Sequence, residues 1–68
     1  NNMGNMSYCR FENTARDLND CLRAIKDGEM DDLSQYERRG LNELLYYAGQ
    51  IVNYTDNIME ALEEYEEN

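Results

Sequence analysis

The sequence predicts a small all-α protein, and three observations support this fold class. Proline is absent from the 68 residues, and glycine occurs only at positions 4, 28, 40 and 49. Apolar residues recur at spacings of three and four in two segments, as on one face of an α-helix. Helix-start patterns and a glycine stop separate the two segments. We expect an antiparallel hairpin made of a short helix over about 14–27 and a long helix over about 34–66.

Five apolar side chains on one face predict the shorter helix: Phe11, Ala15, Leu18, Leu22 and Ile25. Asn13 or Thr14 can cap its start, because residues 14–17 resemble a capping box with Asp in place of Glu. Gly28 is expected to follow its end, since glycine adopts the left-handed conformation found after helix C-termini. Residues 7–12 are then expected to form a short extended lead-in.

A capping box and a heptad pattern predict the longer helix. Ser34 and Glu37 have the capping-box spacing. With Leu41 at heptad position a, positions a, d, e and g carry no charge through Tyr65. We call these fifteen residues the apolar stripe: Gly40, Leu41, Leu44, Leu45, Tyr47, Ala48, Ile51, Val52, Tyr54, Thr55, Ile58, Met59, Ala61, Leu62 and Tyr65.

The continuity of this pattern predicts one unbroken helix. A break near Gly49–Asn53, which would give three helices, remains the alternative. Gly40 and Gly49 do not shift the heptad register, so we interpret them as close-packing sites or mild bends, although each costs about 1 kcal/mol relative to alanine.

The apolar stripe is too long and too wide for the shorter helix to cover. At about 1.5 Å per residue the two helices span roughly 20 and 45 Å, so a hairpin leaves the far half of the stripe exposed. Exposed apolar patches of this kind usually mark an interface. We expect a homodimer in which two hairpins form a four-helix arrangement, although a different protein as the cover stays open. The expected dimer interface is Ile51, Val52, Tyr54, Ile58, Met59, Leu62 and Tyr65.

Acidic residues dominate the second half of the chain. The net charge is −9, and residues 40–68 hold seven acids and no base. Nucleic acids and anionic membranes are disfavoured as direct partners, because binding them requires Lys and Arg. A basic protein surface is the natural electrostatic partner. The expected contact residues are Asp56, Glu60, Glu63, Glu64 and Glu67; a frayed, solubilising tail is the alternative.

Two adjacent tyrosines form a second candidate contact site. Tyr46 falls on the polar face of the predicted long helix, next to Tyr47 at the edge of the stripe. Tyrosine is favoured at protein interfaces, so the pair is a candidate aromatic patch. Exposed single aromatics are common, and this interpretation of Tyr46 also stays open.

The sequence predicts no catalytic, metal or cofactor site, and we do not expect an enzyme. Histidine is absent, so Cys9 and Cys21 lack the usual base partner, and a structural zinc ion lacks ligands. We expect free thiols, with a Cys9–Cys21 disulfide as the alternative. No apolar run approaches the ~20 residues of a membrane span, and no signal segment precedes residue 7, which together favour the cytoplasm.

The N-terminal part resembles the opening of small uncharacterised bacteriophage proteins. The resemblance rests on Met6-Ser7-Tyr8-Cys9-Arg10-Phe11-Glu12-Asn13-Thr14, followed by Asp17-Leu18 and Asp20-Cys21, about a quarter of the chain. It implies a phage accessory protein, a class that includes many small acidic inhibitors of host machinery, such as anti-CRISPR and other anti-defence proteins. The family supplies no residue roles, and the long second helix departs from its shorter members.

These observations combine into one expected organisation and two functional hypotheses. Residues 1–6 are expected to be a disordered or non-native lead, and residues 7–68 a single helical domain. The first hypothesis is an inhibitor that binds a basic, nucleic-acid-handling host protein, in the manner of a nucleic-acid mimic. The second is a structural dimerisation or adaptor module that works through the apolar stripe.

Overall fold

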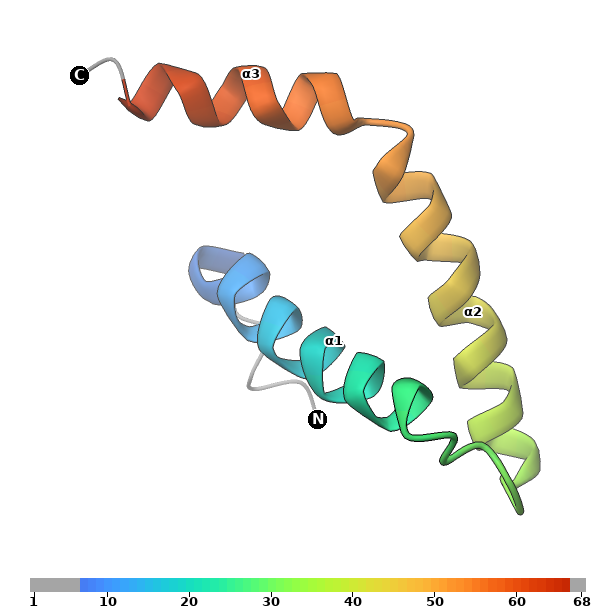
Figure 1. Ribbon diagram of the computed structural model, residues 1–68. Coiled ribbons are helices and arrows are strands. Elements are labelled where there is room, and N and C mark those ends of the chain that lie inside the picture. The colour runs from blue at the N-terminus through green and yellow to red at the C-terminus, as the bar shows by residue number, and fades with distance from the viewer. Residues whose placement is uncertain (1–6, 67–68) are drawn as a thin grey trace. The chain divides into compact units, whose positions relative to one another are not determined.

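The computed structural model describes residues 7–66 and confirms the all-α class (Figure 1). A short 3₁₀ helix, η2 (Ser7–Cys9), leads into α1 (Arg10–Lys26), and α2 (Gln35–Val52) and α3 (Thr55–Glu66) follow, with no strand among the described residues. The chain divides into two units, Asn1–Asp32 and Leu33–Asn68, which we describe separately. The expected lead over 1–6 lies outside the described residues, and the single domain and the hairpin stay predictions.

The first helix begins four residues earlier than its capping residues predict. The expectations of an extended stretch over 7–12 and of a cap at Asn13 or Thr14 are wrong, because both residues lie inside α1. The apolar face explains the earlier start, since Phe11 lies one turn before Ala15 on the same face. Glu12 adds support in the first turn, where an acid complements the helix dipole and accepts a hydrogen bond from Arg16 at 3.1 Å.

Gly28 follows the end of α1 as the sequence predicts. Its φ of 74° lies in the left-handed region, which side chains disfavour. Its N–H donates to the carbonyl of Ile25 at 3.0 Å, and the N–H of Glu29 donates to the carbonyl of Ala24 at 2.9 Å. These two bonds form a Schellman motif, which satisfies carbonyls that the helix end leaves without intrahelical partners.

The cap at the start of α2 is also confirmed. Ser34 is the N-cap, and its hydroxyl accepts a hydrogen bond from the N–H of Glu37 at 3.1 Å. Arg38, one turn further on, donates from Nη1 to the carbonyl of Leu33 at 2.8 Å. Two hydrogen bonds, one to the Ser34 hydroxyl and one to the Leu33 carbonyl, thus stabilise the start of α2.

The prediction of one long helix over 34–66 is wrong, and the alternative with a break is confirmed. A turn at Asn53 and Tyr54 separates α2 from α3 (Figure 1). The N–H of Tyr54 donates to Ile51 three residues back, and the Thr55 hydroxyl donates to the carbonyl of Val52 in place of a backbone N–H. β-Branched residues, Asn and Asp are weak helix formers, and they are concentrated here, which explains the break.

Gly40 and Gly49 have no close neighbour among residues 7–66 at the place where a side chain would stand. A Cβ atom built at either position meets no heavy atom within 4 Å, and neither residue has a positive φ. The interpretation of these glycines as close-packing sites therefore finds no support within the chain. Gly49 does accept, at its carbonyl, a hydrogen bond of 3.3 Å from Asn53 as α2 ends.

Apolar side chains remain accessible throughout the described part of the protein. None of residues 7–66 is buried, so neither unit has a closed core of its own. In the same part of the chain, no helix is both long and apolar enough to cross a membrane.

Candidate protein-binding surface

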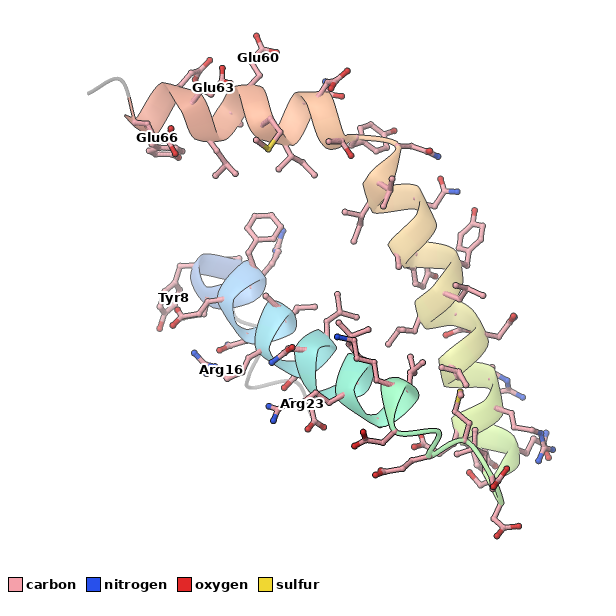
Figure 2. All side chains as sticks on the ribbon, viewed as in Figure 1. Tyr8, Arg16, Arg23, Glu60, Glu63 and Glu66 are labelled. Carbon is pink, nitrogen blue, oxygen red and sulfur yellow. The ribbon has the colours of Figure 1, made fainter. Side chains whose placement is uncertain are left out.

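The candidate acidic residues form one face of α3. Asp56, Glu60, Glu63 and Glu64 follow one another at separations of four, three and one residues, so at 100° per residue they fall within a sector of about 100° around the helix axis. We call these four residues the acidic face. Figure 2 shows Glu60 and Glu63 projecting from the same side of α3, whereas Glu66 does not join them. Glu67, the fifth predicted contact residue, lies outside the described residues.

The acidic face has no base on its own segment, because residues 40–68 contain no Lys or Arg. Asp56 and Glu64 are eight residues apart, about 12 Å along the axis, so the average axial separation between successive charges is about 4 Å. One strand of duplex DNA carries a charge about every 3.4 Å of its axis. The acidic face therefore has nearly the linear charge density of a single nucleic-acid strand.

The helix itself is destabilised by this arrangement. Glu60 and Glu64 repel one another at the i,i+4 spacing, and acids in the last turns oppose the helix dipole at about 0.3–1 kcal/mol each. No basic residue stands in the last turn of α3 to offset them. A bound basic surface would remove this unfavourable energy, so the same charges that weaken α3 favour such a partner.

The apolar stripe continues on the opposite side of α3 from the acidic face. Ile58 is 41% exposed and Leu62 is 51% exposed, and Met59 and Tyr65 are also open to solvent. The remaining predicted interface residues, Ile51, Val52 and Tyr54, are exposed as well. Each side of α3 therefore offers a different surface, one acidic and one apolar.

Tyr46 and Tyr47 come together on α2 as an aromatic pair. Their ring centroids are 5.3 Å apart with an interplanar angle of 70°, an edge-to-face arrangement. Both rings are exposed, as a contact site requires. The sequence interpretation missed a second aromatic contact on α2, in which the guanidinium of Arg39 lies over the exposed ring of Tyr36 with Cζ 5.9 Å from the centroid. The i,i+3 spacing of Tyr36 and Arg39 predicts such a contact, because residues three apart are neighbours on a helix surface.

The two cysteines cannot bridge within one chain. Cys9 is the N-cap of α1 and Cys21 lies inside it, and both are free. Twelve residues of helix separate them by about 18 Å, whereas a disulfide requires Cα atoms within about 7 Å. Helix geometry therefore excludes the Cys9–Cys21 disulfide within one chain, and the expectation of free thiols stays a prediction. Over residues 7–66, no group of three or more Cys, Asp or Glu side chains is arranged to hold a metal ion.

Comparison with known proteins adds no relative. No protein-family model, curated protein or solved structure matches this chain. The function must therefore be argued from the surfaces of the described helices.

Proposed function

We propose that this chain is a non-enzymatic interaction protein that binds a basic protein through the acidic face of α3 and associates with itself through the apolar stripe. The target is a nucleic-acid-handling protein of a bacterial host, as the resemblance to phage accessory proteins implies. The observation that carries the proposal is the spacing of Asp56, Glu60, Glu63 and Glu64 at about 4 Å per charge on one side of a helix without bases.

Electrostatics supports a basic site as the target of this face. Clustered charges of one sign attract a complementary surface over a Debye length of about 8–10 Å at physiological salt. A site that binds phosphates already holds Lys and Arg side chains at comparable spacing. The acidic face can therefore occupy the site and exclude the nucleic acid.

The test compares two variants that remove the same number of charges. The first is D56N/E60Q/E63Q/E64Q, which neutralises the acidic face. The control is D17N/D20N/E29Q/D31N, which neutralises four exposed acids outside α2 and α3. Each chain is immobilised and used to capture proteins from a bacterial lysate, and circular dichroism confirms that the helices persist.

We expect the intact chain and the control to capture one basic protein that the first variant fails to capture. The purified target should then lose its binding to duplex DNA or RNA as the intact chain is added. Equal capture by the first variant would show that the acidic face is not the contact surface. Unchanged nucleic-acid binding by the captured protein would exclude inhibition by mimicry.

The exposed stripe favours a second candidate, a structural dimerisation or adaptor module. In that case the working surface is apolar, and I58D or L62D removes activity together with self-association. Light scattering gives the mass of these variants. A variant that is monomeric and still captures the target would exclude the adaptor function.

A further inference from the structure

We propose that a second copy of this chain covers the apolar stripe in an antiparallel orientation, so that α2 of each copy lies along α3 of the other. The inference rests on the self-association proposed above and specifies its geometry. It concerns only the unit Leu33–Asn68 and is argued from charge, register and the position of the helix break.

The charge distribution of this unit selects the antiparallel orientation. Its two bases, Arg38 and Arg39, stand near the start of α2, together with the acids Glu37 and Glu43. Its remaining acids lie on or after α3, where no base accompanies them. A parallel pair would place the acids of α3 beside their own copies, which is repulsive. An antiparallel pair separates the two acidic ends and brings each of them to the end of the other copy that carries Arg38 and Arg39.

The heptad positions that flank the seam provide the register. Position e holds Arg38, Leu45, Val52, Met59 and Glu66, and in an antiparallel pair the e positions of the two helices face each other. The residue types in this series are arranged symmetrically about Val52. Seven residues to either side of Val52 are apolar Leu45 and Met59, and fourteen residues to either side are the opposite charges of Arg38 and Glu66.

A two-fold axis beside Val52 therefore pairs apolar residues with apolar residues and a basic residue with an acidic one. Val52 meets its own copy, and Leu45 meets Met59 of the second copy. These three side chains are 67%, 72% and 52% exposed, so each has apolar surface to bury. Arg38 meets Glu66 of the second copy at both ends of the dimer, and both side chains are exposed and accessible.

Arg38 is already positioned for this contact. Its Nη1 donates to the carbonyl of Leu33 at 2.8 Å, which fixes the side chain at the start of α2. A guanidinium has five N–H donors, so four remain for a carboxylate. The bond within the chain and the bond to Glu66 of the second copy are thus compatible.

The break between α2 and α3 does not disturb the pairing. It falls at Asn53 and Tyr54, directly beside the proposed axis. Each paired segment is consequently an uninterrupted helix, α2 on one side and α3 on the other. The two-residue turn inserts no extra residue, so the heptad count continues along the sequence from α2 into α3.

Cross-linking of single cysteines tests the orientation in the full chain. Cys9 and Cys21 are first replaced by Ser, and light scattering confirms that the mass in solution is unchanged. V52C, L45C and M59C are then each treated with a short bismaleimide, and a mixture of L45C and M59C is treated in the same way. In an antiparallel dimer, two V52C chains are cross-linked to each other, whereas two L45C chains or two M59C chains are not. The mixture gives a cross-link between one L45C chain and one M59C chain. The two thiols of an L45C dimer would be offset by fourteen residues, about 21 Å along the axis, beyond a short linker.

A charge-swap cycle tests the register independently. R38E and E66R should each raise the dimer Kd about fivefold, because each disturbs two exposed ion pairs of about 0.5 kcal/mol. The double variant R38E/E66R should return to within about twofold of the starting Kd. The control R39E/E63R carries the same charge changes at positions f and b, away from the seam. Its change in dimerisation free energy should equal the sum of the changes caused by the two single substitutions.

Each outcome decides between the alternatives. A monomer at all concentrations overturns both the inference and the proposed self-association. Efficient linking of L45C to itself indicates a parallel dimer and overturns only the inference. An antiparallel dimer in which R38E/E66R fails to recover overturns the register. None of these results depends on capture of the basic target, so failure of the acidic face is recognised separately.

Discussion

The break between α2 and α3 makes the sharpest prediction for the isolated chain. Replacing Asn53 and Thr55 by alanine should convert the turn into continuous helix. Alanine is favoured over Asn or Thr in a helix by about 0.6 kcal/mol at each position, so the double variant gains about 1.2 kcal/mol. The Thr55 hydroxyl no longer competes for the carbonyl of Val52, which can then accept from the N–H of Asp56 as in an uninterrupted helix.

Backbone hydrogen exchange measured by NMR reports this change residue by residue. The first N–H groups of a helix have no intrahelical acceptor, so Thr55, Asp56 and Asn57 should exchange fast in the intact chain. A gain of about 1.2 kcal/mol corresponds to roughly eightfold slower exchange of these amides in N53A/T55A. Amides in the middle of α2 should change little, since the substitutions lie beyond its end.

The matched control is N42A, which makes the same Asn-to-Ala change on an exposed position of α2. It should slow exchange around residue 42 and leave Thr55 to Asn57 unchanged. If the intact chain already protects Thr55, Asp56 and Asn57 as strongly as α2, the helix is continuous and our account of the break is refuted. Unchanged protection in N53A/T55A would show that weak helix propensity is not its cause.

Three further predictions concern individual elements and are checked by thermal melting of the helices. G49A should stabilise α2 by about 1 kcal/mol, because alanine is the better helix former and its Cβ meets nothing within 4 Å. G28A should destabilise the end of α1 by about 1–2 kcal/mol, because the φ of 74° at this position is unfavourable for a residue with a Cβ. Equal effects of the two substitutions would contradict the assigned backbone conformations. S34A should cost about 1 kcal/mol by removing the acceptor for the Glu37 N–H, while S34D should retain the stability; loss in both would argue against the cap. E64K should stabilise α3 by about 0.3–0.5 kcal/mol, because the new lysine can pair with Glu60 one turn earlier. Salt at about 0.5 M should largely remove this stabilisation. A stabilisation that does not depend on salt would rule out an electrostatic cause.

The elements that sequence predicts well are those fixed by short-range bonds. Ser34 and Gly28 each determine a helix end through contacts within four or five residues, and both ends are confirmed. Asn13 and Thr14 predict a start of α1 that is too late, because the apolar face reaches back to Phe11. A potential N-cap residue does not mark the start of a helix when the residues before it continue the apolar face.

The heptad pattern does not predict the break between α2 and α3. The turn at Asn53 and Tyr54 inserts no residue, so the apolar spacing passes through without a shift. Local propensity was the better signal, since the weak helix formers are concentrated at the turn. For the acidic face the sequence was sufficient, because residues three and four apart on one helix necessarily share a side.

The two surfaces of α3 are energetically linked, because the helix is too short to be stable alone. It has 12 residues, the range in which isolated helices are marginal even with favourable sequences. Its acids lower that stability further, so helix formation must draw on contacts outside the segment. Burial of Ile58 and Leu62 in a dimer and neutralisation of Glu60 and Glu64 by a basic protein would each supply it. Either event pre-forms the helix that the other requires, and dimerisation should therefore strengthen target binding even though the two surfaces lie on opposite sides of α3.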